Sequence, residues 1–138
     1  MATWGGKGLD ESFKAAIDLS SYQYRFVKAG SVAGEVTYAT AGSVPLTLGI
    51  LQNDPKATEE ATVRLFGISK LSASGALTSG TGSAIAHGEP LTSGSNGIGL
   101  HASACVFNAI ALEALAAGIG GTIKVFLVTP GARLAKEQ

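Results

Sequence analysis

The residues best able to bind a metal are His87, His101 and Cys105. Zinc takes four protein ligands in a structural site and three plus water in a catalytic one, so a carboxylate would have to join them to close a structural site. Cys105 lies in an apolar run, and apolar surroundings blunt a thiol as a nucleophile. The pattern favours ordinary histidines and a buried cysteine. We therefore expect no metal and no cofactor.

The segment 97–102 fits a loose G-x-G-x-x-A pattern. A dinucleotide site needs a strand before this motif, a helix after it and an acidic residue about 20 positions further on. Here a Gly/Ser-rich stretch precedes the motif, and Ala117-Gly118 occupies the place of the acid. The motif therefore does not predict a nucleotide site.

Two pairs of adjacent carboxylates, Asp10-Glu11 and Glu59-Glu60, are the candidates for acid–base chemistry. Neighbouring side chains on a strand point to opposite faces, so the two members of a pair cannot easily share a proton. We place both pairs in solvated loops. The chain also lacks G-x-S-x-G, P-loop and H-E-x-x-H motifs. Nothing forms a catalytic constellation, and we predict that the protein is not an enzyme.

The composition bounds the class of protein. A chain of 138 residues suits one domain, and its single cysteine permits no intrachain disulfide. Ten Lys and Arg balance ten Asp and Glu, without the basic excess of a nucleic-acid binder. No apolar run approaches the roughly 20 residues of a membrane span, and the N-terminus lacks an apolar signal core. We expect a protein made in the cytoplasm that binds neither nucleic acid nor membrane.

Charged side chains are sparse, at 14% of the residues. Near-zero net charge on such a surface promotes association. Hydrophobic residues reach 46% although aromatic residues are only 7%, so the apolar content is mostly small. This mixture predicts a turn-rich β protein that packs closely against copies of itself.

Strand signals recur between clusters of Gly, Pro, Asn and Ser. The runs are Tyr22–Lys28, Val36–Thr40, Leu46–Leu51 and Thr62–Ile68, with shorter apolar runs at Ala84–Ala86 and Pro90–Leu91. Many short strands at such spacing are typical of a sandwich or a barrel. We predict an all-β fold, a small barrel of short antiparallel strands, formed by a single domain over residues 15–130.

The segment Asn108–Ala117 supports two interpretations. It is rich in helix formers, with Asn108 as a potential N-cap and Gly118 as a C′ residue. However, Ile110, Leu112 and Ala114 alternate as in a strand. Propensity alone favours the helix.

An internal repeat favours the strand. Residues 50–66 and 110–126 match at a constant offset of about 60 positions. If the first copy is a strand–loop–strand unit, the second is expected to be one too. The match places Arg64 with Lys124 and Phe66 with Phe126. The alternate positions, predicted to face the core, are Val63, Leu65, Ile123 and Val125.

The two ends of the chain have no periodic apolar pattern. Residues 1–14 are predicted to form a flexible arm because Gly5, Gly6 and Gly8 loosen its backbone. Trp4 and Phe13 are the arm's aromatic residues, able to bury large apolar areas against a partner. Trp4 could equally fold back onto its own domain. Residues 131–138 are predicted to form a polar tail.

The order of the motifs resembles a family of small phage capsid decoration proteins, also called head-stabilising or cement proteins, once catalogued as a domain of unknown function. The resemblance covers about Ala16 to Val128. The segments that carry it are Gln23–Lys28, Gly49–Asn53, Glu60–Gly67, Ala109–Ala114 and Ile123–Leu127. The family's usual strands read P-x-G-V-L-Q-N, A-G-E-x-A-T-V-R and I-G-I-A-L-E-A. Here Glu59-Glu60 replaces Gly-Glu, and Asn108-Ala109 replaces Ile-Gly.

This resemblance implies a fold related to the tulip-like decoration protein of phage lambda. It also implies homotrimers on the exterior of the capsid in the virion, with the major capsid protein as partner. In such proteins an N-terminal arm often reaches the capsid protein, so Trp4 and Phe13 are the expected capsid contacts. The family is not known for catalysis.

Two other classes compete with this interpretation. A trimeric nucleotide hydrolase of the dUTPase type matches in size and β content. However, its catalytic Asp within a Gly-rich motif is missing, and residues 72–99 contain no Asp. A head-fibre or adhesin module would bind host glycans through exposed aromatics over polar groups. Residues 72–99 contain no aromatic residue either.

Overall fold

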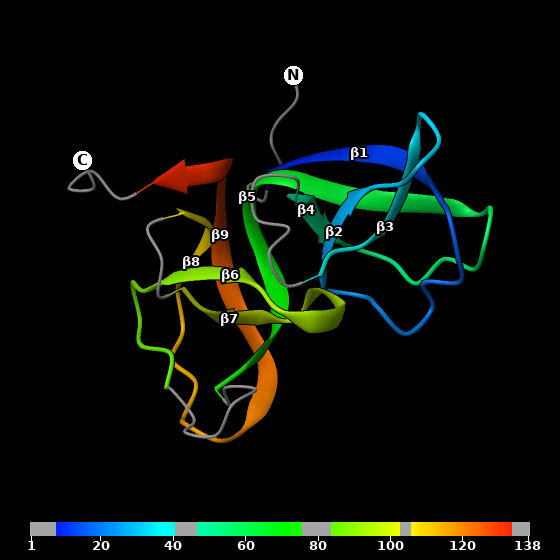
Figure 1. Cartoon of the computed structure of the whole chain (residues 1–138). Coiled ribbons are helices and arrows are strands. Elements are labelled where there is room, and N and C mark those ends of the chain that lie inside the picture. Colours follow the sequence, from blue (N-terminus) through cyan, green and yellow to red (C-terminus); the bar gives the residue numbers. More distant parts are fainter. Residues whose placement is uncertain (1–7, 41–46, 76–83, 103–105, 134–138) are drawn as a thin grey trace.

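The computed structural model describes residues 8–40, 47–75, 84–102 and 106–133 (Figure 1). Nearly all of this part of the chain is β structure, which confirms the all-β prediction. The strands are β1 (Gly8–Ala15), β2 (Phe26–Ala29), β3 (Glu35–Tyr38), β4 (Thr47–Leu51), β5 (Glu60–Ser74), β6 (Pro90–Ser93), β7 (Gly99–His101), β8 (Val106–Ala111) and β9 (Gly120–Arg133), with a short 3-10 turn, η2 (Ser95–Gly97). No helix in the described ranges has the length and apolar character to cross a membrane.

The strand pairings close two rings that share β5. The first ring runs β1-β3-β2-β4-β5, and β1 pairs with β5 from Gly67 back to Glu60. The second runs β5-β7-β6-β8-β9, and β9 pairs with β5 from Gly67 to Ser74. Figure 1 shows the two rings as neighbouring lobes joined by the bent β5. Gly67 lies where β5 passes from one ring to the other, and its φ of 108° is a conformation that favours glycine.

Not every strand is short or antiparallel, contrary to the expectation. β5 has 15 residues and β9 has 14. β1 runs parallel to β3, and β5 runs parallel to β7. The two long strands are needed because β5 must serve both rings, and β9 pairs with β5 on one edge and β8 on the other.

Each ring has its own core. The smaller cluster, in the first ring, consists of Ala15, Leu19, Val27, Val36, Leu51, Ala61 and Val63. The larger cluster consists of Phe26, Ala39, Ile50, Leu71, Ala73, Ile85, Leu91, Ala109, Ala111, Ile123, Val125 and Leu127. Adjacent residues on β2 and β4 divide between the clusters, because successive strand side chains point to opposite faces. These two strands therefore form a wall between the two cores.

Three of the four predicted core residues of the repeat are buried, namely Val63, Ile123 and Val125. Leu65 is only half-buried and packs against the rim of the smaller cluster. The alternation was therefore predicted correctly, although β5 turns Leu65 partly outward as it approaches Gly67.

The predicted boundaries of the domain need correction at both ends. Residues 8–14 were assigned to the arm but belong to β1, which pairs with both β3 and β5. Residues 131–133 were assigned to the tail but belong to β9. Local sequence misses both because the pairing comes from strands distant in the chain. Residues 1–7, with Trp4, and residues 134–138 lie outside the described part.

The strand predicted over Tyr22–Lys28 begins only at Phe26. Residues 22–25 form turns, in which Arg25 N–H donates to the Tyr22 carbonyl over 3.1 Å. Tyr24 has a φ of 66°, which is incompatible with a strand. Tyr22 stacks on Tyr38 with ring centroids 4.8 Å apart, so an aromatic contact replaces the expected ladder.

The segment 108–117 is a strand end followed by a loop, and not the helix that its propensity favours. Ala111 closes β8, and Leu115 forms a bridge to Ile85. The matched segments 50–66 and 110–126 are both antiparallel hairpins. Their registers differ by two residues, since Ile50 pairs with Arg64 but Ile110 pairs with Phe126. A shift of two preserves the faces of the strands, which explains why the core pattern carries over.

Candidate functional site

The residues considered for metal binding do not come together in the described part of the chain. His101 Nδ1 lies 3.0 Å from Glu89 Oε1, and His87 is exposed on a turn. No group of three or more His, Cys, Asp or Glu within the described ranges could hold a metal. Cys105 lies outside these ranges.

The G-x-G-x-x-A segment leads into a strand and not into a helix. Gly97 ends η2, and Gly99 begins β7. A Cβ on Gly99 would lie 2.4 Å from Leu71 Cδ2, so this glycine permits close packing of β7 on the larger cluster. The close packing of β7 therefore explains Gly99 without a nucleotide.

The acidic pairs serve structural contacts. Asp10 and Glu11 lie within β1 and not in a loop, because β1 is longer than expected. Glu59 Oε1 accepts a hydrogen bond of 2.8 Å from the backbone N–H of Lys56 and so closes the turn before β5. Glu60 accepts a hydrogen bond from the hydroxyl of Ser12 on the neighbouring strand β1.

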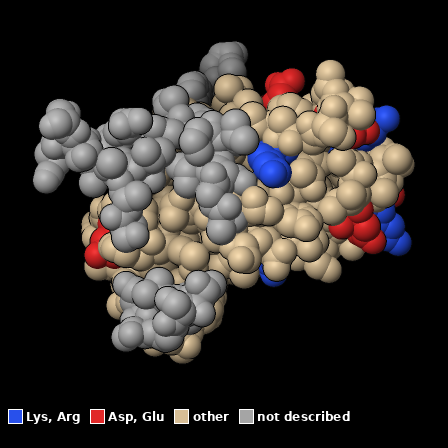
Figure 2. All heavy atoms as spheres, in the orientation of Figure 1, with Lys and Arg blue, Asp and Glu red and all other residues tan. Residues whose placement is uncertain are grey.

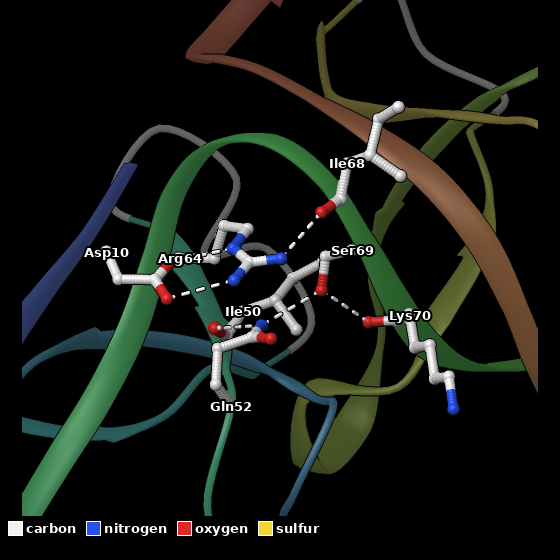
Figure 3. Close-up of polar contacts among 7 residues, drawn as sticks. All are labelled: Asp10, Ile50, Gln52, Arg64, Ile68, Ser69 and Lys70. Atoms are coloured by element: carbon white, nitrogen blue, oxygen red, sulfur yellow. Dashed lines mark hydrogen bonds and ion pairs between the residues drawn. The ribbon is translucent and has the colours of Figure 1, made fainter. Parts of the chain in front are cut away.

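A cavity of about 210 Å³, here called the junction hollow, opens where the two rings meet. Its lining residues come from both rings: Tyr24, Gln52, Arg64, Ile68, Ser69, Lys70 and Lys124. Figure 3 shows the polar contacts along β5 at this place.

Arg64 is held firmly at one side of the junction hollow. Its Nε lies 2.6 Å from Asp10 Oδ1, its Nη2 lies 2.9 Å from Asp10 Oδ2, and its Nη1 donates to the Ile68 carbonyl over 2.8 Å. The hydrogen bond to Asp10 raises the pKa of Arg64 above its already high ordinary value. The guanidinium therefore links β1 to β5 beside Gly67, and its charge is compensated.

The floor of the junction hollow is also fixed by hydrogen bonds. Gln52 Nε2 donates to the Ile50 carbonyl over 3.0 Å and to Ser69 Oγ over 2.9 Å. Ser69 Oγ in turn donates to the Lys70 carbonyl over 2.8 Å. Ser69 is only 4% exposed. This network fixes the floor, and the Gln52 amide and the Ser69 hydroxyl already donate their hydrogen bonds within the protein.

Tyr24 forms a wall of the junction hollow in a conformation unusual for an aromatic residue. Its φ is 66°, and sparsely populated backbone conformations cost of order 1–3 kcal/mol. Two backbone hydrogen bonds of 2.7 Å hold it, from Tyr24 N–H to the Leu51 carbonyl and from Ser72 N–H to the Tyr24 carbonyl. The Lys70 ammonium lies 5.7 Å from the centre of the Tyr24 ring.

Lys70 and Lys124 are the other two cations that line the junction hollow. They are direct partners on the β5–β9 ladder, and both are exposed. Within the described ranges neither ammonium has an ion-pair partner. Both also line a second hollow of about 180 Å³, together with Glu113, Thr122 and Ile123. Glu113 Oε1 accepts the backbone N–H of Lys124 over 2.9 Å.

An apolar patch lies beside Gly67, formed by Leu9, Phe66 and Phe126. Leu9 and Phe66 are paired on β1 and β5 and are 54% and 43% exposed. Phe66 and Phe126 pack edge to face with ring centroids 5.7 Å apart. The repeat matched these two phenylalanines by sequence, and the structure brings them into contact.

The expected capsid-contact residues have different places. Phe13 is half-buried on β1 and packs against the smaller cluster. Its ring therefore contributes to the domain's own core. Trp4 falls outside the described residues.

Comparison with known proteins gives a likeness in fold. No family model matches the chain, and no curated protein sequence matches it, so neither comparison supports the resemblance to the decoration family. A solved structure does match: the N base of the head fibre protein gp8.5 of bacteriophage phi29. The TM-score is 0.64 at 14% identity, over 91% of this chain and 97% of that chain. The chain is similar in fold to a head-fibre base.

Sequence reasoning did not find the junction hollow. Arg64 and Lys124 were matched through the repeat, but nothing local joins Lys70 to Tyr24 or to Lys124. The signal would have been the β5–β9 pairing, which depends on the length of both strands. For β5 that length is not visible locally, because Gly67, Ser69 and Ser72 interrupt its hydrophobic pattern.

Proposed function

We propose that this protein is a structural protein of a phage virion, bound to the exterior of the capsid as a decoration protein. The observation that carries the proposal is the fold likeness to a head-fibre base, which spans nearly the full length of both chains. The ordered set of motifs that resembles decoration proteins supports it independently. Both support a protein whose function is to bind other proteins of the particle.

The partners we propose are two further copies of the chain, forming a homotrimer, and the major capsid protein. On the face of the molecule that Figure 2 shows, few charged side chains of the described residues are visible, and most of these lie toward the ring of β1 to β4. The apolar patch adds exposed hydrophobic area that association would cover. Many copies around one shell also gain avidity, because each bound module raises the effective concentration of its neighbours.

A second candidate function is the base of a head fibre, because the matching structure is itself the base of a head fibre. The two candidates share attachment to the head and differ in what the base carries. A reconstruction of the decorated particle separates them. A decoration protein ends at its own domain, whereas a fibre base continues into a stalk.

The test is binding to heads assembled from the major capsid protein encoded in the same genome. We expect the protein to co-sediment with these heads and to sediment as a trimer when free or bound. A protein that stays in the supernatant at all concentrations would overturn the proposal. We also propose that the protein has no catalytic activity, so a pyrophosphate-release assay with dUTP should give the background rate.

The role proposed for the N-terminal segment can be tested by a truncation that leaves β1 intact. A variant that starts at Gly8 keeps the whole strand, whereas one that starts at Ala15 removes a wall of the first ring. We expect the Gly8 variant to fold and to bind heads more weakly, with Trp4→Ala showing part of that loss. Phe13→Ala is the matched control, because it should lower stability instead. Unchanged head binding by the Gly8 variant would exclude residues 1–7 as the contact.

A further inference from the structure

Two lysines directly opposite each other on a ladder are an unfavourable arrangement. Like charges at such positions repel, and sheets are stabilised by opposite charges there. Lys70 and Lys124 nevertheless face each other at the rim of the junction hollow, and each also lines the second hollow. Glu113, which lines the second hollow, accepts the backbone N–H of Lys124 with its Oε1. An anionic group of another molecule, bound between the two ammonium groups, would relieve their repulsion.

The rest of the lining narrows the chemistry of that anion. Arg64 is committed to Asp10 and Ile68, and the Gln52 amide and the Ser69 hydroxyl donate within the floor. The two ammonium groups remain to meet a ligand beside the Tyr24 ring, whose centre lies 5.7 Å from the Lys70 ammonium. Two hydrogen bonds fix the backbone of Tyr24. Ammonium groups bind a carboxylate through short charge-assisted hydrogen bonds. The Tyr24 ring can pack against the methylene carbons of a side chain that ends in such a carboxylate.

The size of the hollows favours a side chain over a whole small molecule. At about 210 and 180 Å³ they fall below the range of roughly 300–1,000 Å³ typical of small-molecule sites. A sugar would also need free directional donors for its hydroxyls, and the floor offers few. Two lysines without a basic stripe do not make a nucleic-acid surface.

We propose that the junction hollow binds an Asp or Glu side chain of a partner polypeptide, with Lys70 and Lys124 as its cationic ligands and Tyr24 as its wall. The proposal rests on the proposed function, in which the partner is a capsid protein. It adds that the partner presents an acidic segment to the junction between the two rings.

The first test measures binding of a fluorescently labelled oligoglutamate peptide by anisotropy. The test variant is Lys70→Gln/Lys124→Gln, and the control is Lys14→Gln/Lys56→Gln, which removes the same charge from exposed positions away from the hollow. We expect the test variant to bind about fivefold or more weakly than the wild type, and the control to bind within about twofold. Salt should weaken wild-type binding. Equal loss in both variants, or loss in neither, would overturn the proposal.

Two further arms identify the source of the carboxylate and separate this proposal from the proposed function. An oligogalacturonate that binds more tightly than the peptide, with the same dependence on the lysines, would overturn the peptide assignment in favour of an acidic glycan. With heads as the target, failure of the wild type to bind contradicts the proposed function. If the wild type binds and the lysine variant binds equally well, the proposed function stands and the acidic-segment site is wrong.

Discussion

Thr58 and Gly118 occupy the same position in the two matched hairpins, and both have a left-handed backbone, with φ of 70° and 82°. Gly118 adopts this conformation freely, but a β-branched residue there is strained. Thr58 is exposed, while its backbone N–H donates to the Ala15 carbonyl over 2.9 Å. Burial of the Thr58 side chain therefore does not offset the backbone strain, which the hydrogen-bonded turn maintains.

Thr58→Gly should therefore stabilise the protein. Relief of the left-handed strain, about 1–2 kcal/mol, outweighs the roughly 0.5–1 kcal/mol of extra backbone entropy that glycine loses on folding. We expect the free energy of unfolding in urea to rise by about 0.5–1 kcal/mol. Gly118→Ala is the reciprocal control and should destabilise. A Thr58→Gly variant less stable than the wild type would show that the turn does not carry this strain.

Leucine truncations should separate the buried and half-buried positions of β5. Leu71→Ala removes a fully buried side chain from the larger cluster and should cost about 2–5 kcal/mol. Leu65→Ala removes a half-buried side chain at the rim of the smaller cluster, so its cost should be lower, about 1–2 kcal/mol. Chemical denaturation of both variants measures the difference. Equal costs would contradict the outward turn of Leu65 before Gly67.

Asp18 should contribute to the acid sensitivity of the fold. Hydrogen bonds from the hydroxyl and the backbone N–H of Ser20 lower the pKa of Asp18 below its ordinary value. A lowered folded-state pKa gives stability that is present above the unfolded value and is lost as pH falls through the folded value. Asp18→Ala should therefore destabilise the protein at about pH 7 and less so at about pH 2. A destabilisation that is independent of pH would assign the effect to something other than this carboxylate.

The contact between Asp10 and Arg64 should show a measurable coupling energy. The bidentate geometry links β1 to β5, and Arg64 also holds the Ile68 carbonyl. Because Asp10 remains 36% exposed, solvent screens the pair, and we expect a coupling of about 1 kcal/mol. A double-mutant cycle with Asp10→Asn and Arg64→Gln measures it. Additive effects of the two substitutions would leave the pair without a role in fastening β1.

The sequence predicted the class of fold and the core faces of the hairpins because both follow from local alternation. Val63 and Val125 were assigned to the core from their neighbours alone, and both are fully buried. The two-residue shift between the hairpins did not disturb this assignment, because the period of a strand is two.

Elements determined by distant pairing could not be predicted in this way. Residues 8–14 have a composition typical of a loop, yet β5 and β3 provide hydrogen-bond partners on both edges of β1. Conversely, Tyr22 and Tyr24 alternate like strand residues, yet the chain turns there. The junction hollow depends on both features, since Tyr24 is one of its walls and Asp10 on β1 holds Arg64 in place.

Repulsion between Lys70 and Lys124 should lower the free energy of unfolding of the free protein. Lys124→Gln removes it, and we expect a gain in the free energy of unfolding of about 0.2–1 kcal/mol at low salt. Lys14→Gln is a control with the opposite expected effect, because Lys14 lies opposite Glu60 on β5 and Glu35 on β3 in the ladders. It should destabilise. Both differences should shrink as salt screens the exposed charges. A Lys124→Gln variant that is less stable than the wild type at low salt would show that Glu113 already compensates the pair, and the reason for an external anion would be lost.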